Sequence, residues 1–150
     1  MGTHAYSTHL VWQGSTGRGY RAYPRRHTAV APPAAEIEMS ADPHFRGDAD
    51  YANPEQLLVM AASSCQLLSF LAVAAQAGID VIDYEDEAEG VMPGGEPMRI
   101  ERIHLTPVVR VAPGTDHDKV RALLEQAHAG CYIANSLRSE VTLSPTVVNA

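Results

Sequence analysis

Two cysteines, Cys65 and Cys131, are the residues of this 150-residue sequence best suited to redox chemistry. Taken singly, each has an ordinary interpretation, because unpaired cysteine is among the most buried residue types. Taken together, they fit a cycle in which one thiol is oxidised to a sulfenic acid and the other converts it into a disulfide. A cytosolic pair of this kind is therefore either a redox couple or two inert core thiols.

The surroundings of the two cysteines leave both interpretations open. Cys65 falls within an apolar run, but its polar neighbours Ser63, Ser64 and Gln66 are unusual for a core. A reactive thiolate needs nearby positive charge or hydrogen-bond donors, and no basic residue lies in that run. An arginine is therefore expected from elsewhere in the fold.

Cys131 directly follows Gly130 and precedes a short predicted helical turn. A helix N-terminus would lower the pKa of its thiol and leave the sulfur accessible, whereas the alternative is a packed residue at a chain reversal. His128 could join Cys131 as a metal ligand. The seven histidines are otherwise scattered and form no second close pair, so no metal site is expected.

A long helix must position Cys65. Asn53 is a suitable N-cap, Pro54 suits the first helical position, and Glu55 is favoured in the first turn by the helix dipole. The helix is predicted to run to about Ala77 and to stop at Gly78. It is apolar nearly all round, and a chain of this size has little material to surround it, so a partner subunit is expected to complete its cover.

The remaining elements alternate with turns and indicate an α+β fold in a single domain, 1–150. A second helix is predicted from a Thr115 cap to Gly130, with an apolar stripe of Val120, Leu123, Leu124 and Ala127. Turn residues and apolar alternation predict strands at 6–14, 19–23, 34–40, 79–90, 98–111, with a bulge near Glu101, and 140–144.

Composition and charge narrow the classes of function. The formal charge of −7 argues against nucleic acid as a partner. The apolar run 57–78 is interrupted by too many polar residues for a membrane span, and is interpreted as a buried helix. The segment 1–13 has no basic start followed by an apolar run, which indicates no export signal and a cytoplasmic location.

Two motifs resemble one family when they are taken together. Residues 53–58, Asn-Pro-Glu-Gln-Leu-Leu, followed by Ala-Ala-Ser-Ser-Cys at 61–65, resemble the central helix of the OsmC/Ohr family. Residues 127–137, Ala-His-Ala-Gly-Cys-Tyr-Ile-Ala-Asn-Ser-Leu, resemble its second-cysteine segment. The resemblance extends over 10–143. It implies an OsmC-like fold with antiparallel sheets around a long central helix, in an intertwined homodimer.

The same resemblance implies roles for individual residues. Cys65 would attack the O–O bond of an organic hydroperoxide, and Cys131 would resolve the sulfenic acid into a Cys65–Cys131 disulfide. Glu55 and Arg46 would hold Cys65 reactive, with Arg18 as the second candidate for the arginine. Glu55 lies ten residues before Cys65, roughly 15 Å along a helix. We therefore expect Arg46 and Glu55 of one subunit to meet the thiols of the other.

The resemblance also implies a peroxidase that protects against oxidative or osmotic stress without a bound cofactor. Its reductant would be a dithiol such as dihydrolipoamide or a lipoylated protein. Apolar residues beside Cys65 favour alkyl or lipid hydroperoxides. The sequence departs from the family at Gln66, where other members carry histidine. Two alternatives remain: a redox-sensing thiol protein, and a non-catalytic dimer that binds a small ligand.

Overall fold

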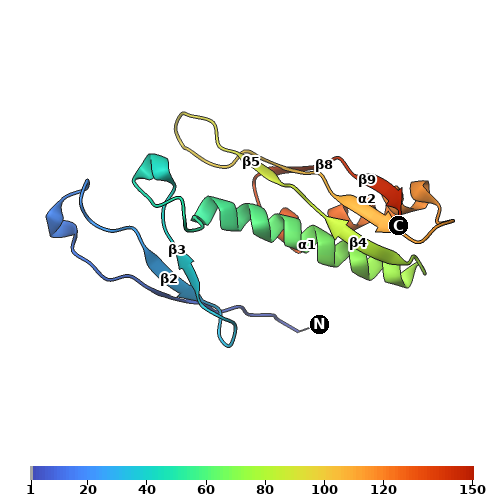
Figure 1. The fold of residues 1–150 in the computed structure, drawn as a ribbon, viewed down its shortest axis with the longest axis horizontal. Helices are drawn as coiled ribbons and strands as arrows, with labels where there is room; N and C mark the ends of the chain where they lie inside the picture. The colour runs from blue at the N-terminus through green and yellow to red at the C-terminus, as the bar shows by residue number, and fades with distance from the viewer. Residues whose placement is uncertain (1) are drawn as a thin grey trace. The chain divides into compact units, whose positions relative to one another are not determined.

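The computed structural model describes residues 2–150, and the chain forms two compact units that divide between Leu57 and Leu58. The first unit carries an antiparallel sheet in the order β1-β2-β3, shown in blue and teal in Figure 1. Its strands are β1 (His9–Val11), β2 (His27–Val30) and β3 (Ile37–Met39), and its two 3₁₀ helices are η1 (Thr16–Arg18) and η2 (Pro43–Phe45).

The predicted strand at 19–23 is wrong, because this segment forms turns and the second strand begins at His27. The turns are held by Arg25, whose guanidinium stacks on Tyr23 at 3.6 Å from the ring centroid. The same guanidinium donates to the carbonyls of Tyr20 and Tyr23. Side-chain contacts of this kind hold backbone carbonyls that a strand would have used for pairing.

The second unit contains most of the secondary structure. Its elements are α1 (Pro54–Gln76, which begins at the end of the first unit), β4 (Val81–Glu85), β5 (Glu89–Val91), β6 (Arg102–Leu105), β7 (Val108–Val111), α2 (His117–Ala129), α3 (Tyr132–Ser136), β8 (Glu140–Leu143) and β9 (Thr146–Asn149). The strands form two three-stranded sheets, β4-β7-β9 and β5-β6-β8.

These two sheets are mixed, which corrects the expectation of antiparallel sheets throughout. β5 pairs with β6, the next strand along the chain, and β4 pairs with β7, both in antiparallel fashion. β8 pairs with β6 and β9 with β7 in parallel. The parallel pairs arise because α2 and α3 lie between β7 and β8, and a helical crossover returns the chain in its original direction.

The predicted strand 98–111 is divided into β6 and β7 at Thr106 and Pro107. Proline has no N–H to donate, so it ends a ladder, and Pro145 stands at the corresponding break between β8 and β9. Asp86 fills the gap: one carboxylate oxygen accepts from the Thr106 N–H at 2.7 Å, and the other accepts from the Ser63 hydroxyl of α1. The main interruption therefore lies at Thr106, beyond the predicted bulge near Glu101.

Helix α1 begins and ends close to its predicted limits. Asn53 accepts from the Gln56 N–H at 2.9 Å, and the Gln56 side chain accepts from the Asn53 N–H at 3.0 Å. This reciprocal capping box satisfies two backbone donors that the first turn would otherwise leave free. Gly78, at φ 73°, follows the last turn.

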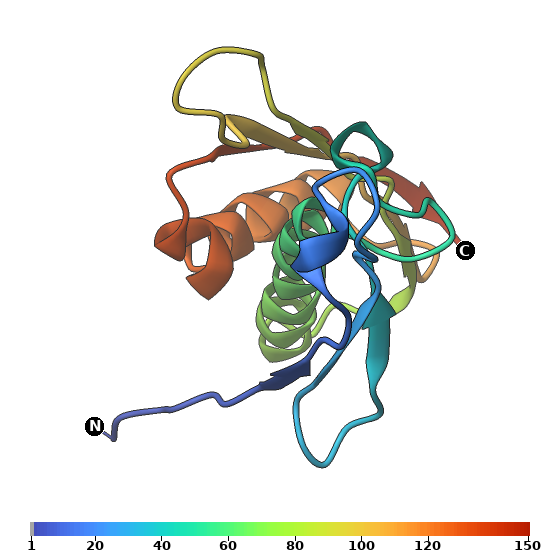
Figure 2. The ribbon, with the colours of Figure 1, turned by 90° about the vertical axis from the view of Figure 1, so that its left-hand side faces the viewer.

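Helices α1 and α2 lie side by side against the strands of the second unit (Figures 1 and 2). Phe70 and Ala74 of α1 pack with Val120 and Leu124 of α2 in the larger core cluster. The four apolar residues predicted to face the core from α2 are all buried: Val120, Leu123, Leu124 and Ala127. Repeats of three and four residues place them on one face of the helix.

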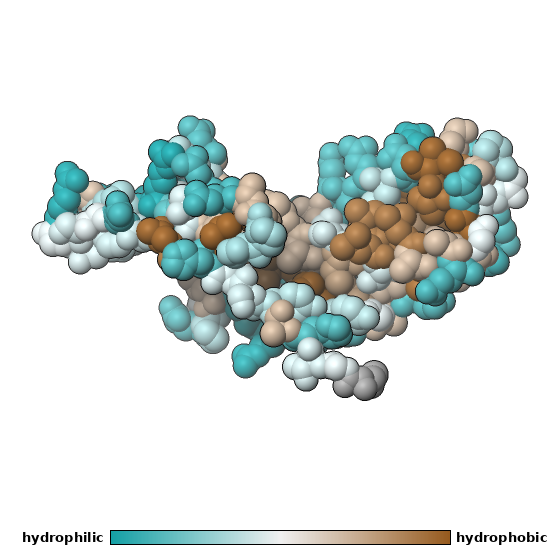
Figure 3. Space-filling view, turned by 90° about the horizontal axis from the view of Figure 1, so that it is seen from below, coloured by the Kyte–Doolittle hydropathy of each residue, from teal (hydrophilic) through white to brown (hydrophobic). Residues whose placement is uncertain are grey.

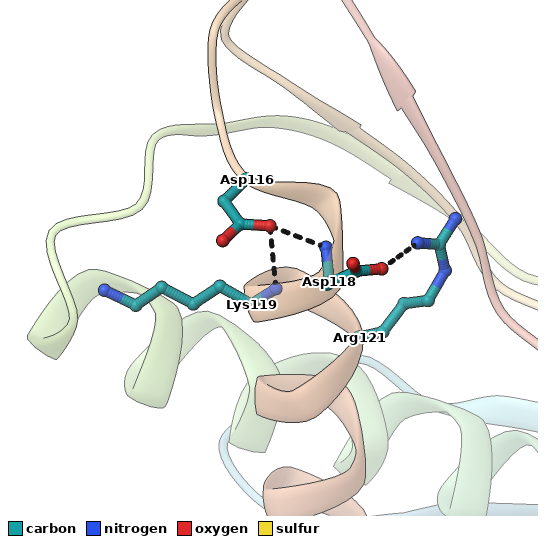
Figure 4. A network of polar contacts seen from close by, with 4 residues as sticks. All are labelled: Asp116, Asp118, Lys119 and Arg121. Atoms are coloured by element: carbon teal, nitrogen blue, oxygen red, sulfur yellow. Dashed lines mark hydrogen bonds and ion pairs between the residues drawn. The ribbon is translucent and has the colours of Figure 1, made fainter.

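The cap of α2 differs from the prediction. Asp116, and not Thr115, is the N-cap, and its carboxylate accepts from the N–H groups of Asp118 and Lys119 (Figure 4). Asp118 in turn accepts from Arg121 at 3.0 Å. A carboxylate at this position accepts from the free N–H groups of the first turn, and its negative charge interacts favourably with the helix dipole. The neutral Thr115 hydroxyl would interact with that dipole less strongly. Thr115 instead donates to the Ala112 carbonyl.

Much of the apolar surface of α1 is exposed in the single chain. Buried positions form one stripe, Ala62, Gln66, Phe70 and Ala74. Large apolar side chains elsewhere on the helix, Met60, Leu68 and Leu71, are 51%, 63% and 37% exposed. Figure 3 views the chain from below relative to Figure 1 and shows areas of hydrophobic surface in brown. By length and composition the helix could also cross a membrane.

Candidate active site

The two thiols meet where the middle of α1 faces the end of α2. Cys65 is half-buried on α1, and Cys131 is 1% exposed at the N-cap of α3. Gly130 ends α2, and the Cys131 N–H donates to the His128 carbonyl at 3.2 Å, which fixes the chain as it turns into α3. The fold thus brings the two cysteines into hydrogen-bonding contact across 66 positions of sequence.

Hydrogen bonds make Cys65 the more acidic thiol. Burial alone would raise its pKa, but hydrogen bonds from Cys131, the Ile133 N–H, the Ser69 hydroxyl and the Tyr132 N–H outweigh it, and the pKa is lowered. Donors aimed at sulfur stabilise the thiolate more than the thiol. Cys65 is therefore the thiol of the pair that ionises more readily.

The pKa of Cys131 is raised, in contrast to that of Cys65. Burial raises its pKa, and the hydrogen bond to Cys65 and the charge of the Cys65 thiolate raise it further, against the N–H groups of Ala134 and Ile133. The Ala134 N–H lies 3.5 Å from Cys131 Sγ. Of the two alternatives for Cys131, the structure favours the packed residue at a chain reversal, because burial and its partner thiolate raise its pKa against the N-terminus of α3. The geometry assigns it the role of a proton-bearing donor to Cys65.

Three of the groups that acidify Cys65 were not identified from the sequence. Ser69 lies four residues after Cys65, a spacing that places two side chains on the same helix face, so this signal was available. The N–H groups of Tyr132 and Ile133 carry no such signal, because they depend on how α3 docks against α1. Together they supply donors where an arginine was expected.

Arg46 sits in a constrained loop of the first unit. It is the only non-glycine residue of those described with a positive φ, 65°, and it ends η2. A Cβ on Gly47 would come within 1.6 Å of the Ala41 carbonyl oxygen, so only glycine allows the loop to close so tightly. The Arg46 guanidinium lies 5.8 Å from the Tyr20 ring centroid. Strained backbone of this kind is common at functional positions.

The two other predicted charged residues also belong to the first unit. Glu55 lies in the first turn of α1, and Arg18 ends η1. Cys65 and Cys131 belong to the second unit. The roles assigned to Arg46, Glu55 and Arg18 at the thiols therefore stay predictions.

Gln66 is fully buried beside the site. Its side chain donates to the Leu124 carbonyl of α2 at 3.0 Å, while its Oε1 has no hydrogen-bond partner among the described residues. The Gln66 amide thus joins α1 to α2.

A cavity of about 350 Å³ opens on another flank of α1. Its wall combines apolar and polar side chains: Val59, Met60, Ser63, Ser64, Leu67, Tyr84, Asp86 and Ala88. Cys65 is not part of this wall. Within residues 2–150, no group of three His, Cys, Asp or Glu side chains is arranged to hold a metal ion.

Comparisons with known proteins bear on the fold of the chain. The sequence model of the OsmC-like protein family matches residues 47–146. No curated protein matches the chain. An OsmC-like protein of unknown function from Vibrio cholerae O1 biovar eltor is 26% identical, with 95% of this chain and 99% of that chain covered and a TM-score of 0.87.

Two further solved structures share the fold at lower identity. An organic hydroperoxide resistance protein from Elizabethkingia anophelis is 22% identical, with 98% of this chain and 99% of that one covered and a TM-score of 0.69. An organic hydroperoxide resistance protein from Legionella pneumophila is 18% identical, with coverages of 97% and 98% and a TM-score of 0.64. These likenesses support a mixed α+β fold of the OsmC-like kind.

Proposed function

Because the chain belongs to the OsmC-like protein family, we propose that it is a cysteine-based peroxidase that reduces organic hydroperoxides. The observation that carries the proposal is the division of roles between two thiols in contact. The pKa of Cys65 is lowered and the pKa of Cys131 is raised. A peroxidase needs one thiolate to attack and one protonated thiol to follow, and this pair supplies both.

The proposed cycle balances without metal or flavin. The Cys65 thiolate attacks the terminal oxygen of the hydroperoxide, the O–O bond breaks, and the alkoxide leaves and takes a proton to become an alcohol. The Cys131 thiol then attacks the Cys65 sulfenic acid, which forms the S–S bond and releases water. A dithiol reductant, such as dihydrolipoamide or a lipoylated protein, returns both thiols by exchange.

A homodimer would complete the site. The exposed apolar side chains of α1 suit a second copy of the same helix, and a partner would also bring its own Arg46 and Glu55 to Cys65. In this arrangement, the guanidinium stabilises the thiolate and the carboxylate orients the guanidinium. The constrained backbone at Arg46 supports a role for this residue over Arg18.

Substrate class follows from the surroundings of Cys65. Leu68, exposed on the next turn of α1, offers an apolar surface near the thiol. Alkyl or lipid hydroperoxides gain contact there that hydrogen peroxide does not. We propose stress protection in the cytoplasm as the setting.

The test is steady-state consumption of cumene hydroperoxide with dihydrolipoamide as reductant. Turnover is expected for the natural chain and not for Cys65→Ser, while Cys131→Ser should react once and then stall. Equal turnover by Cys65→Ser would refute the proposal.

A second candidate, a redox sensor, is favoured by the burial of Cys131. A disulfide whose second sulfur is 1% exposed is shielded from an external dithiol, which slows reduction. A disulfide that forms rapidly with peroxide but is reduced too slowly for sustained turnover would favour this function over the peroxidase.

A further inference from the structure

Helices α1 and α2 carry the two halves of the thiol site, but a single hydrogen bond joins them in the described part of the chain. It runs from Gln66 Nε2 to the Leu124 carbonyl at 3.0 Å. The other contacts between the helices are apolar, such as those of Phe70 and Ala74 with Val120. Apolar contacts are non-directional, so this bond is the directional contact between the Cys65 turn and α2.

Gln66 is one residue from Cys65, and the far end of this connection reaches Cys131. Leu124 and His128 are one turn apart on α2, so their side chains lie on the same face of that helix. The His128 carbonyl accepts from the Cys131 N–H at 3.2 Å. A continuous path therefore runs from Cys65 through Gln66, along the last turn of α2, to Cys131.

Two polar atoms along this path are buried without partners among residues 2–150. Gln66 Oε1 can only accept, and His128 Nδ1 can donate when the proton is on that nitrogen. Gln66 lies at the Leu124 carbonyl and His128 one turn farther along α2, and one of the two atoms accepts where the other can donate. A buried amide oxygen left unpaired is costly, and a single water bridging the two residues would satisfy both atoms.

We propose that Gln66 and His128 are positioning residues for closure of the Cys65–Cys131 disulfide, joined to each other by a hydrogen-bonded bridge. The proposal rests on the proposed function for its chemistry: the S–S bond forms as the S–O bond of the Cys65 sulfenic acid and the S–H bond of Cys131 break, and water leaves. Neither residue touches the peroxide. Their effect is to hold the two sulfurs within the narrow separation that a disulfide requires.

The test separates geometry from peroxidase chemistry. Diamide, an azo compound that takes up two electrons and two protons, drives closure of the Cys65–Cys131 disulfide without any peroxide. The rate is measured by loss of free thiols in the intact protein. Gln66→Met keeps the volume and removes both polar atoms, and is expected to slow closure by about tenfold or more. The matched control is Gln76→Met, the same exchange at an exposed position of α1, with closure unchanged.

Two further variants keep the outcome interpretable. Gln66→His retains a ring N–H that can donate to the Leu124 carbonyl, and is expected to recover most of the rate. His128→Phe, at a half-buried position, keeps a ring and removes both ring nitrogens. It should slow closure in the natural chain but add little to Gln66→Met, because bridged residues act as a unit. This cycle remains informative even if Gln66→Met lowers the melting temperature, since Gln66→His and His128→Phe can be compared alone.

The results discriminate clearly. Slow closure in Gln66→Met and His128→Phe, with recovery in Gln66→His, supports the proposal. Closure at the natural rate in Gln66→Met, or effects of the two substitutions that simply add, would overturn it. If no peroxide oxidises the natural chain but diamide closes it rapidly in a Gln66-dependent way, the proposed function fails while the positioning role stands.

Discussion

Cys65 and Cys131 share a hydrogen bond, and their pKa values move in opposite directions, down for Cys65 and up for Cys131. Of the two thiols, Cys65 therefore loses its proton at the lower pH, and Cys131 keeps its proton to a higher pH. Burial alone would raise both pKa values, so the difference comes from the donors that converge on Cys65.

Selective alkylation at low pH follows from this asymmetry. A thiol with a lowered pKa keeps a larger thiolate fraction as the pH falls, so iodoacetamide should modify Cys65 well before Cys131 below pH 7. In Cys131→Ala, Cys65 loses its largest hydrogen-bond donor, its pKa rises, and its rate profile moves to higher pH. Peptide mass mapping across a pH series measures both effects. Equal labelling of the two cysteines at every pH would contradict the assignment.

Ser69 should tune the same thiolate. Removing its hydroxyl in Ser69→Ala raises the Cys65 pKa, so alkylation below that pKa should slow by about three- to tenfold. The difference should vanish at high pH, where Cys65 is fully ionised in both proteins. Ser64→Ala, at an exposed position of the same helix, is the matched control and should match the natural profile. A Ser69→Ala profile that overlays that of Ser64→Ala would exclude the role.

Mixed dimers test whether the charged residues act across subunits. A dimer of one Cys65→Ser chain and one Glu55→Ala chain should regain one working site, because the intact Cys65 then faces an intact Glu55. Arg46→Ala chains should behave like Glu55→Ala chains in the same assay, whereas Arg18→Ala serves as the comparison. Peroxidase activity no higher than that of either parent dimer would show that each site is built within one chain.

Asp86 should matter for stability and not for the thiols. Its carboxylate accepts from Ser63 and from the Thr106 N–H at the break between β6 and β7. Asp86→Ala leaves the half-buried donor at Thr106 unpaired and should lower the free energy of unfolding by about 1–3 kcal/mol. Urea unfolding beside the exposed control Glu87→Ala measures this. A loss no larger than that of the control would contradict the bridging role.

Local signals in the sequence were sufficient for the elements that depend on nearby residues. Asn53, Pro54 and Gly78 define α1 because capping and termination act within a few residues. The spacing of the apolar residues in α2 predicted its buried face in the same way. The family motifs identified both cysteines, and the structure brings these two together.

Features that depend on residues distant in sequence were not predicted. The parallel pairing of β8 and β9 depends on the crossover through α2 and α3, and no local pattern encodes strand direction. The raised pKa of Cys131 depends on its burial against Cys65. The N–H groups of Tyr132 and Ile133 are invisible in the sequence, since every residue but proline has one.

The most direct test of the central claim is intact-protein mass analysis after one equivalent of cumene hydroperoxide is added to the fully reduced chain. The account predicts loss of two hydrogens with a Cys65–Cys131 disulfide in peptide maps, and gain of one oxygen at Cys65 in Cys131→Ala. A reduced natural chain with the peroxide unconsumed, or oxidation that persists unchanged in Cys65→Ser, would contradict it.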